Sequence, residues 1–284
     1  MPADLTLNTP AVLNAADGTA LSFTDFMVDD TAGRCGGIVL MHGLGEHGGR
    51  YRHVARFFND CGWSVRIYDH RGHGRSGGPR GDVPHQDTLL QDAEIVIGDF
   101  AHQLGAPPLL FGHSMGGLFA ARLALAAKMP LAGLILSSPA LALPLSRGQL
   151  LLLKILSAIA PGLAVPNGLK TQFLSHDPAV AVAYHSDRLV HGRISARLLH
   201  SMRAAVADCQ AQAATLAIPV LMVVAGDDRL VDAQGSHLFF RQLPQELRKM
   251  HCYDRFYHEI FNEIDAQRVF ADVRAWLDVD RRIA

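Results

Sequence analysis

The chain has little net charge, few cysteines and no long hydrophobic run. Its 26 Lys+Arg nearly balance 27 Asp+Glu, so the net charge is -1 and no basic surface for a nucleic acid is expected. The cysteines, Cys35, Cys61, Cys209 and Cys252, are scattered without C-x-x-C spacing. This scatter predicts neither a disulfide framework nor a zinc site, and it indicates reduced thiols in a cytoplasmic protein.

No segment reads as a membrane span or a secretory signal. The most apolar stretch, residues 150–159, is interrupted by Lys154 and ended by Pro161. It is shorter than the roughly 20 residues that a membrane span needs. The first residues lack a basic start followed by an apolar run, so we expect no secretory signal. A length of 284 residues with 49% hydrophobic side chains suits one large α/β domain with an insertion.

Strand and helix patterns alternate along most of the chain. It opens with an alternating segment, 11–26, around Asp17-Gly18, which predicts a hairpin. The expected strands are 37–41, 63–68, 107–111, 131–136, 219–224 and 247–253, and the expected helices are 50–60, 89–104, 117–127, 232–242 and 265–277. Such alternation predicts an α/β fold with a mostly parallel twisted sheet and helices on both faces.

The alternation stops after the strand at 131–136. Residues 141 to about 215 are mostly helical in pattern, with prolines as breaks. We therefore predict a core formed by 1–140 and 215–284, and a helical cap at 141–214 inserted into it. The cap is expected over the carboxyl edge of the sheet, where open α/β sheets bind ligands.

The pentapeptide Gly112-His113-Ser114-Met115-Gly116 fits G-x-S-x-G and stands between an expected strand and an expected helix. This setting is typical of the nucleophile elbow, a sharp turn in which a strained serine presents its hydroxyl above the sheet. Side chains at the two glycines would collide with the neighbouring strand and helix. The sequence therefore predicts Ser114 as a catalytic nucleophile at a helix N-terminus that favours negative charge.

A serine nucleophile needs a base, and the base needs a carboxylate that holds its tautomer. In α/β-hydrolases the acid and then the histidine follow the serine along the chain. We predict Asp228 as the acid and His258 as the base, with Asp227 as the alternative acid. Asp232 is interpreted as the N-cap of the following helix. The alternative for His258 is an ordinary surface-loop histidine.

The oxyanion of an acyl-transfer intermediate needs two backbone donors. One is expected from Met115, the residue after the nucleophile, and the other from the loop 42–49, where we assign Leu44. The same loop contains Gly43-x-Gly45-x-x-Gly48, which also matches a dinucleotide-binding fingerprint. In that alternative an acidic residue about 20 positions on, here Asp69, would bind the ribose, but it explains nothing at the predicted nucleophile.

Several histidines could in principle form a metal site, but their spacing does not favour one. His70 and His73 lack the i, i+4 spacing of a zinc pair, and Asn262 replaces the second histidine of H-E-x-x-H after His258. We expect loop packing instead, with the segment 69–76 as a structural brace of the site. We also expect His113 to pack under the elbow. No metal and no cofactor are predicted.

Four segments, 42–51 (HGLGEHGGRY), 69–76 (DHRGHGRS), 112–117 (GHSMGG) and 226–232 (GDDRLVD), resemble the monoacylglycerol lipase and lysophospholipase family of serine hydrolases. The likeness covers roughly 12–140 and 215–280 and is weak in the cap. It implies an α/β-hydrolase fold and a helical lid that forms an acyl-chain tunnel. It also implies that Ser114, Asp228 and His258 form the triad and that Leu44 and Met115 donate to the oxyanion.

The resemblance further implies that Glu46 and Arg50 bind the glycerol end of the substrate. The alternative is that these two charges pair with each other as a local brace. Mammalian members carry a second histidine, which contacts glycerol, three residues after the catalytic one. Here that position is Phe261, so we expect the polar end of the substrate to differ.

The sequence thus predicts a serine ester hydrolase that acts on monoacylglycerol-like lipid esters through an acyl-enzyme. The alternatives are a lysophospholipase, a carboxylesterase of short or medium chains, a proline-type aminopeptidase and a non-catalytic binding protein. The apolar segment 150–159 is interpreted as a lid that lines the tunnel and makes transient contact with a membrane surface. The expected partner is a small lipid ester, no nucleic acid partner is expected, and the sequence assigns no oligomeric state.

Overall fold

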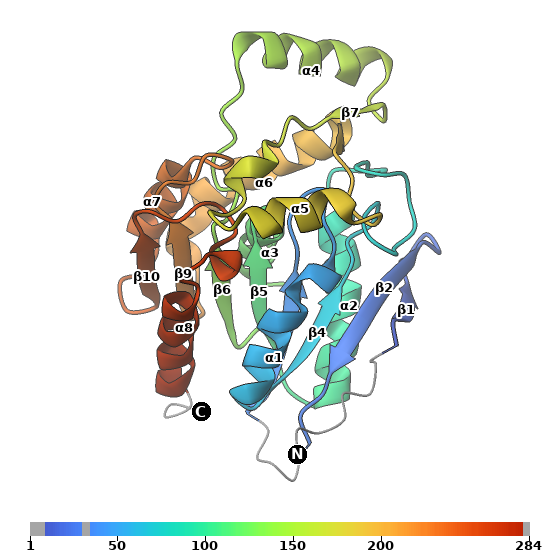
Figure 1. Cartoon of the computed structure of the whole chain (residues 1–284). Helices are drawn as coiled ribbons and strands as arrows, with labels where there is room; N and C mark the ends of the chain where they lie inside the picture. The colour runs from blue at the N-terminus through green and yellow to red at the C-terminus, as the bar shows by residue number, and fades with distance from the viewer. Residues whose placement is uncertain (1–8, 30–34, 281–284) are drawn as a thin grey trace.

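The computed structural model describes residues 9–29 and 35–280, and one eight-stranded sheet runs through it (Figure 1). The strands lie in the order β1-β2-β4-β3-β5-β6-β9-β10. β1 and β2 pair antiparallel, as do β2 and β4, and every other pair is parallel. Their bounds are β1 Ala11–Asn14, β2 Ala20–Phe26, β3 Gly36–Met41, β4 Trp63–Tyr68, β5 Leu109–His113, β6 Gly133–Ser137, β9 Val220–Ala225 and β10 Arg248–Tyr253.

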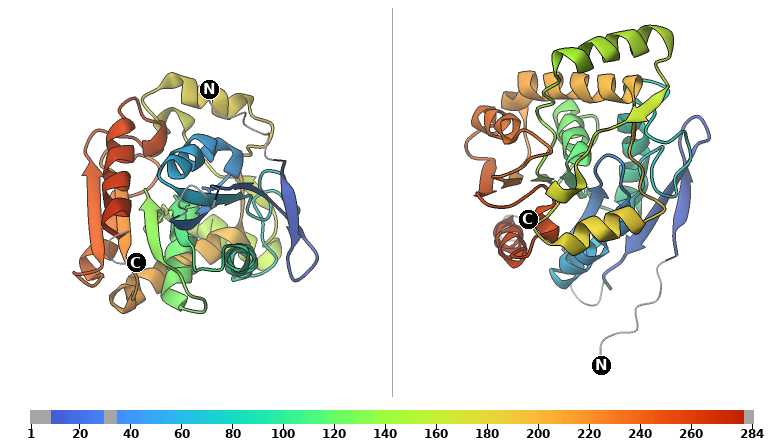
Figure 2. Two further views of the ribbon diagram at one scale, coloured as in Figure 1. Left: turned by 90° about the horizontal axis from the view of Figure 1, so that it is seen from below. Right: turned by 45° about the horizontal axis from the view of Figure 1, so that its top comes forward.

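Helices cover both faces of the sheet, because the side chains of each strand alternate between two cores. In β3, Ile38 and Leu40 join one core, and Val39 and Met41 join the other. The first core is completed by α1 and α8, and the second by α2, α3, α6 and α7 (Figure 2). Their bounds are α1 Arg52–Asp60, α2 Thr88–Leu104, α3 Met115–Ala126, α6 Ala196–Gln212, α7 Ala233–Gln242 and α8 Gln267–Asp280. The predicted fold class is confirmed.

The elements deviate from expectation mainly at their ends. β5 begins at Leu109 rather than two residues earlier, because Pro107 and Pro108 have no N–H to give to a strand ladder. The helix expected from residue 50 starts as a 3-10 turn, η2 (Gly48–Tyr51), and continues as α1. Asp232 caps α7, as interpreted, by accepting from the Gln234 N–H.

Apart from the 3-10 turn η5 (Ile260–Asn262), which follows β10, the remaining elements of the described residues lie between β6 and β9. They are α4 Arg147–Ile159, β7 Ala164–Pro166, η3 Thr171–Phe173, α5 Pro178–Ser186, β8 Arg193–Ser195 and η4 Ala213–Thr215, together with α6. The pattern predicted helices with proline breaks, and it did not indicate the antiparallel ribbon of β7 and β8. Three residues per strand are too few for a period-two signal.

The inserted segment has two parts with different packing. α6 lies against α3 and contributes Leu198, Met202 and Cys209 to the core, whereas α4 lies above α6 and away from the sheet (Figure 1). α6 falls inside the predicted cap, 141–214, but it packs as part of the core. The division of the chain into a core and a cap at these residues therefore stays a proposal. Among the described helices, none has the length and apolarity that crossing a membrane requires.

The turn between β5 and α3 is fixed by backbone contacts on every side. Ser114 has φ 54° and ψ -119°, a strained conformation for a residue with a side chain. Its N–H donates to Ser137 O at 3.0 Å, and its carbonyl accepts from the N–H groups of Leu118 and Ala140. An added Cβ at Gly116 would lie 2.5 Å from His42 O and closer still to Met41 O. The end of β3 thus touches the start of α3 through backbone alone.

We expect Gly116→Ala to lower the free energy of unfolding by about 1–3 kcal/mol, because neither carbonyl can move without shifting β3. The measurement is urea unfolding followed by circular dichroism. The matched control is Gly98→Ala in the middle of α2, where an added Cβ meets nothing within 4 Å. That change should leave stability equal or raise it by about 0.5–1 kcal/mol. Equal effects of the two substitutions would contradict this explanation of the turn.

Candidate active site

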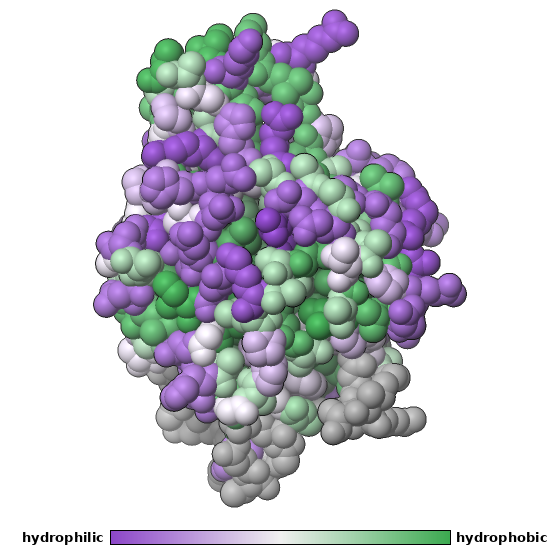
Figure 3. Space-filling view, turned by 180° about the vertical axis from the view of Figure 1, so that it is seen from behind, coloured by the Kyte–Doolittle hydropathy of each residue, from purple (hydrophilic) through white to green (hydrophobic). Residues whose placement is uncertain are grey.

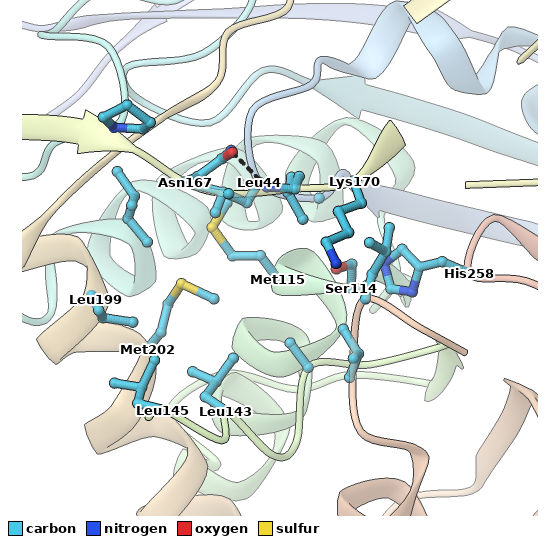
Figure 4. Close-up of a pocket in the computed structure, with 18 of the residues that line it drawn as sticks. Leu44, Ser114, Met115, Leu143, Leu145, Asn167, Lys170, Leu199, Met202 and His258 are labelled. Atoms are coloured by element: carbon cyan, nitrogen blue, oxygen red, sulfur yellow. Dashed lines mark hydrogen bonds between the residues drawn. The ribbon is translucent and has the colours of Figure 1, made fainter. Parts of the chain in front are cut away.

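Ser114 opens into a pocket of about 570 Å³ at the carboxyl edge of the sheet, beneath the inserted segment. The residues predicted as nucleophile, base and oxyanion donors all line it. Figure 4 shows Ser114 and His258 next to each other at one side of this pocket. The structure therefore brings together side chains that lie 144 positions apart in the sequence (258 − 114).

His258 and Asp228 form a buried pair. The Nδ1 atom of His258 lies 2.7 Å from Asp228 Oδ2, and their side chains are 6% and 2% exposed. The other oxygen, Oδ1, accepts from the backbone N–H groups of Leu230 and Val231, both at 2.9 Å. Asp227, the alternative acid, instead points outward and pairs with the exposed Arg229. The geometry places Asp228, and not Asp227, against the histidine.

The electrostatics of this pair favour a charged imidazolium. Burial opposes protonation of His258, but the Asp228 carboxylate outweighs it, and the pKa of His258 is raised above its ordinary value. Burial likewise opposes ionisation of Asp228, but the charge and hydrogen bond of His258 hold the pKa of Asp228 below its ordinary value. The ring can therefore accept a proton at Nε2 while the carboxylate remains ionised.

A second imidazole, that of His113, is buried beside His258. The ring of His113 is centred 4.7 Å from that of His258, and its Nδ1 lies 3.0 Å from Ser137 Oγ. Burial, followed by the neighbouring His258, lowers the pKa of His113 to about 3. His113 is thus neutral at ordinary pH and adds no charge that would repel a protonated His258.

The loop after β3 runs directly over the serine. An added Cβ at Gly43 would lie 3.2 Å from Ser114 Cβ, and Leu44 lines the pocket. Met115 is the first residue of α3, so its N–H has no partner within the helix. The two backbone segments predicted to hold an oxyanion therefore border the serine.

Glu46 and Arg50 are joined to each other and to a third residue, Glu259. Arg50 Nη1 donates to Glu46 Oε2 at 2.5 Å and to Glu259 Oε1 at 2.6 Å, and its Nη2 donates to Glu259 Oε2 at 2.8 Å. Glu46 Oε1 accepts from the Gly43 N–H and the Tyr51 hydroxyl, both at 2.6 Å. All four carboxylate oxygens are engaged, which favours the brace interpretation over direct contact with glycerol.

The segment 69–76 also braces the site. Asp69 accepts from the N–H groups of Gly48 and Arg75, at 2.8 and 2.7 Å, so its carboxylate is used within the fold and leaves the dinucleotide interpretation without its ribose acid. His42 accepts from the His70 N–H and donates to Gly43 O. Over the described parts of the chain, no group of His, Cys, Asp or Glu is arranged to hold a metal ion.

The rest of the pocket is apolar and is built mainly by the inserted segment. Figure 4 shows Leu143, Leu145, Leu199 and Met202 together, on the side away from His258. From α4 the pocket receives Leu152, Leu153 and Leu156. A hydrocarbon chain attached to a group at Ser114 would therefore have an apolar path.

Phe261 does not reach the pocket. Its ring lies 5.4 Å from that of Phe111 and 5.1 Å from that of Phe270, in the core beneath α1 and α8. Phe261 is therefore not a lining residue, and the expected difference at the polar end of the substrate stays a prediction. The polar lining that sequence reasoning missed includes Glu259, Lys170 and Tyr184. Of these three residues, only Glu259 could have been expected near the site from the sequence, because it directly follows the predicted base.

Comparison with known proteins gives a consistent result. Residues 33–265 match the family model described as serine aminopeptidase, S33. A monoacylglycerol lipase of Mycolicibacterium smegmatis is 36% identical over 259 residues, covering 89% of this chain and 91% of that protein. Phospholipase YtpA of Bacillus subtilis is 33% identical over 248 residues, which cover 85% of this chain and 94% of that protein. The crystal structure of Paleococcus ferrophilus monoacylglycerol lipase superposes with a TM-score of 0.80 at 32% identity. The superposition covers 92% of this chain and 99% of that one.

We expect Asp228→Asn to lower the pKa of His258 below the ordinary value of about 6.5, because burial then acts without the opposing carboxylate. Proton NMR titration of the ring Hε1 resonance, assigned with His258→Gln, measures this directly. Asp227→Asn removes a neighbouring charge that does not touch the ring, and it should leave the titration unchanged. A similar fall in both variants would show that Asp228 does not set the pKa.

Proposed function

The chain belongs to the serine aminopeptidase S33 family, and we propose that it is a serine hydrolase of single-chain lipid esters, with monoacylglycerols as principal substrates. The observation that carries this proposal is the path from Ser114 into the leucine-lined part of the pocket. One acyl chain fits such a path, and the ester carbonyl then lies at the elbow. The relatives named above are monoacylglycerol lipases and a phospholipase, which agrees with this substrate class.

In the proposed reaction, Ser114 Oγ attacks the carbonyl carbon while His258 Nε2 accepts the hydroxyl proton. The backbone N–H groups of Leu44 and Met115 donate to the developing oxyanion. His258 then protonates the leaving alcohol, and the acyl group stays on Ser114. A water molecule, deprotonated by His258, releases the fatty acid. Asp228 stays ionised throughout, and these steps require no metal or organic cofactor.

We assign Glu46 and Arg50 a positioning role in this reaction. Glu46 holds the Gly43 N–H, and Gly43 precedes the proposed oxyanion donor Leu44. Arg50 connects Glu46 to Glu259, the neighbour of His258. The pair therefore helps to position the loop that carries Leu44 and, through the backbone of Glu259, the base His258. Direct contact with the glycerol end of the substrate is the alternative role.

The aminopeptidase alternative lacks a place for the substrate amine. Such an enzyme must bind a free ammonium group, for which an unpaired carboxylate is the usual partner. The pocket-lining carboxylates are those of Glu46 and Glu259, and both are already ion-paired with Arg50. Within the described pocket the inserted segment supplies no acidic residue, and it does supply Lys170. Assay with a proline anilide tests this alternative.

The exposed side of α4 suggests how the protein reaches a lipid phase. Figure 3 shows hydrophobic residues gathered at the end of the molecule formed by α4. Leu151 is 60% exposed and Ile159 75%. Apolar patches of this kind mark lipid or protein contacts. We propose transient contact of this surface with membranes by a protein that resides in the cytoplasm, in line with its cysteine pattern.

We expect Ser114→Ala to lower the turnover of 1-oleoylglycerol by about 10^4-fold or more and to abolish labelling by a fluorophosphonate probe. Fatty-acid release from monoacylglycerols, lysophospholipids and p-nitrophenyl esters of graded length defines the substrate class. Preference for the monoacylglycerols supports the proposal. A labelled protein that hydrolyses only short p-nitrophenyl esters would instead be a general carboxylesterase. Full activity of the Ser114 variant would refute the mechanism.

Shortening the pocket-lining side of α4 should affect long substrates selectively. We expect Leu153→Ala with Leu156→Ala to lower kcat/KM for a C16 ester by about tenfold and to leave a C4 ester nearly unchanged, because the long chain loses burial equivalent to about two methylene groups, at about 0.8 kcal/mol each. The control is Leu151→Ala, on the outer side of the same helix. It should leave soluble esters unaffected and slow hydrolysis of lipids presented in vesicles. Equal losses on C4 and C16 esters would argue against an acyl path here.

A further inference from the structure

One cation in the pocket has no role in the proposed reaction. Lys170 lines the pocket, and Figure 4 shows its side chain extending from the inserted segment toward Ser114 and His258. The backbone on either side is held in place. The Asn167 N–H donates to Gly192 O at 2.8 Å, and the Phe173 N–H donates to Lys170 O at 3.0 Å. A fixed backbone with a lysine directed at the reacting group makes this residue a candidate for substrate recognition.

The carboxylates of the pocket lining, the proposed base and the other cationic side chain have partners. Glu46 and Glu259 pair with Arg50, His258 pairs with Asp228, and Arg229 pairs with Asp227. No carboxylate of the described residues lies within 4.0 Å of the Lys170 ammonium group. Lys170 is thus the one pocket-lining cation, among the residues that the structure describes, whose charge is available to a ligand.

The charge balance of the pocket gives Lys170 a further effect. Glu46, Arg50 and Glu259 together carry one excess negative charge, since two carboxylates share one guanidinium. Without Lys170 this wall would repel an anion. With it, the charges of Glu46, Arg50, Glu259 and Lys170 balance, and a strongly hydrated point charge of the kind that binds phosphate faces the substrate.

We propose that Lys170 is a specificity-determining residue that binds an anionic headgroup, the phosphate of a lysophospholipid, on the alcohol side of the scissile ester. This inference rests on the proposed function, because it takes the acyl chain to lie along the leucine-lined path. The alcohol then projects toward the polar end, where Lys170 lies. It deepens the proposal by naming the residue through which anionic lysophospholipids, already an alternative substrate class above, are bound beside neutral monoacylglycerols.

The test compares substrates that share one acyl chain and differ in headgroup charge. The substrates are 1-oleoylglycerol, 1-oleoyl-glycero-3-phosphate and 1-oleoyl-glycero-3-phosphocholine, each presented in neutral detergent micelles. The readout is kcat/KM for each lipid and the ratio of the anionic to the neutral substrate. The variants are Lys170→Gln, Lys170→Glu and Lys170→Arg. The matched control is Lys154→Gln, which removes the same charge from α4 at a position outside the pocket lining.

We expect Lys170→Gln to lower the anionic-to-neutral ratio by about fivefold, the size of a partly exposed ion pair. Lys170→Glu should lower it further, and Lys170→Arg should retain it. The difference in this ratio between the wild type and Lys170→Gln should shrink as the salt concentration is raised, because salt screens the attraction between the ammonium group and the phosphate. Lys154→Gln should leave the ratio unchanged. A ratio that falls equally in the Lys154 variant would assign the effect to the overall charge of the protein and overturn the proposal.

The remaining outcomes are also decisive. Equal ratios in the wild type and in all Lys170 variants, with the lipids still hydrolysed, would overturn the role of Lys170 and leave the proposed function intact. If the wild type hydrolyses none of the three lipids, the proposed function fails, and this inference fails with it. Inorganic phosphate at matched ionic strength should not change the ratio. Loss of the ratio at low millimolar phosphate would assign Lys170 to the free anion instead of the headgroup.

Discussion

The guanidinium of Arg50 connects two parts of the pocket that no backbone ladder joins. It bridges Glu46, in the loop after β3, and Glu259, in the loop after β10, and its side chain is 11% exposed. Removing one partner of such a buried network typically costs about 3–5 kcal/mol, because a charge is left without compensation. Glu46 accepts a hydrogen bond from the Gly43 N–H, and Gly43 directly precedes the proposed oxyanion donor Leu44. The proposed base, His258, directly precedes Glu259. This one side chain therefore helps to set the distance between these two functional groups.

The elements that the sequence predicted well are those whose chemistry is local. The turn at Ser114 could be predicted because Gly112 and Gly116 stand where a Cβ would strike backbone atoms, and the structure shows both contacts. The alternation of buried strands and amphipathic helices likewise predicted the α/β sheet. Asp228 could be placed beside His258 only through the order typical of a known fold, and nothing in its own sequence neighbourhood excludes Asp227.

What could not be predicted depends on contacts between distant segments. Glu259 pairs with Arg50 across 209 positions, so no local pattern could indicate that the Glu46–Arg50 pair is a three-residue network. The exposed face of α4 was an open question in the sequence, since an apolar helix fits a buried site as well as a surface one. Its exposed leucines settle the arrangement of the helix. The place of Phe261 also depends on distant contacts, because its side chain packs in the core against Phe111 and Phe270, and the expected difference at the polar end of the substrate stays a prediction.

The inserted segment combines a fixed part with a loosely attached one. The fixed part is hydrogen-bonded to the loop of the proposed base, since the His258 N–H donates to Phe173 O and the Glu259 N–H donates to Leu174 O. Lys170 precedes these residues, so its position is coupled to that of the base. α4, in contrast, rests on α6 with the side-chain hydrogen bond between Ser157 and His200. The proposed headgroup residue Lys170 thus belongs to the part that is bonded to the loop of His258, whereas α4, which supplies part of the apolar lining and the proposed lipid-contact surface, rests on α6.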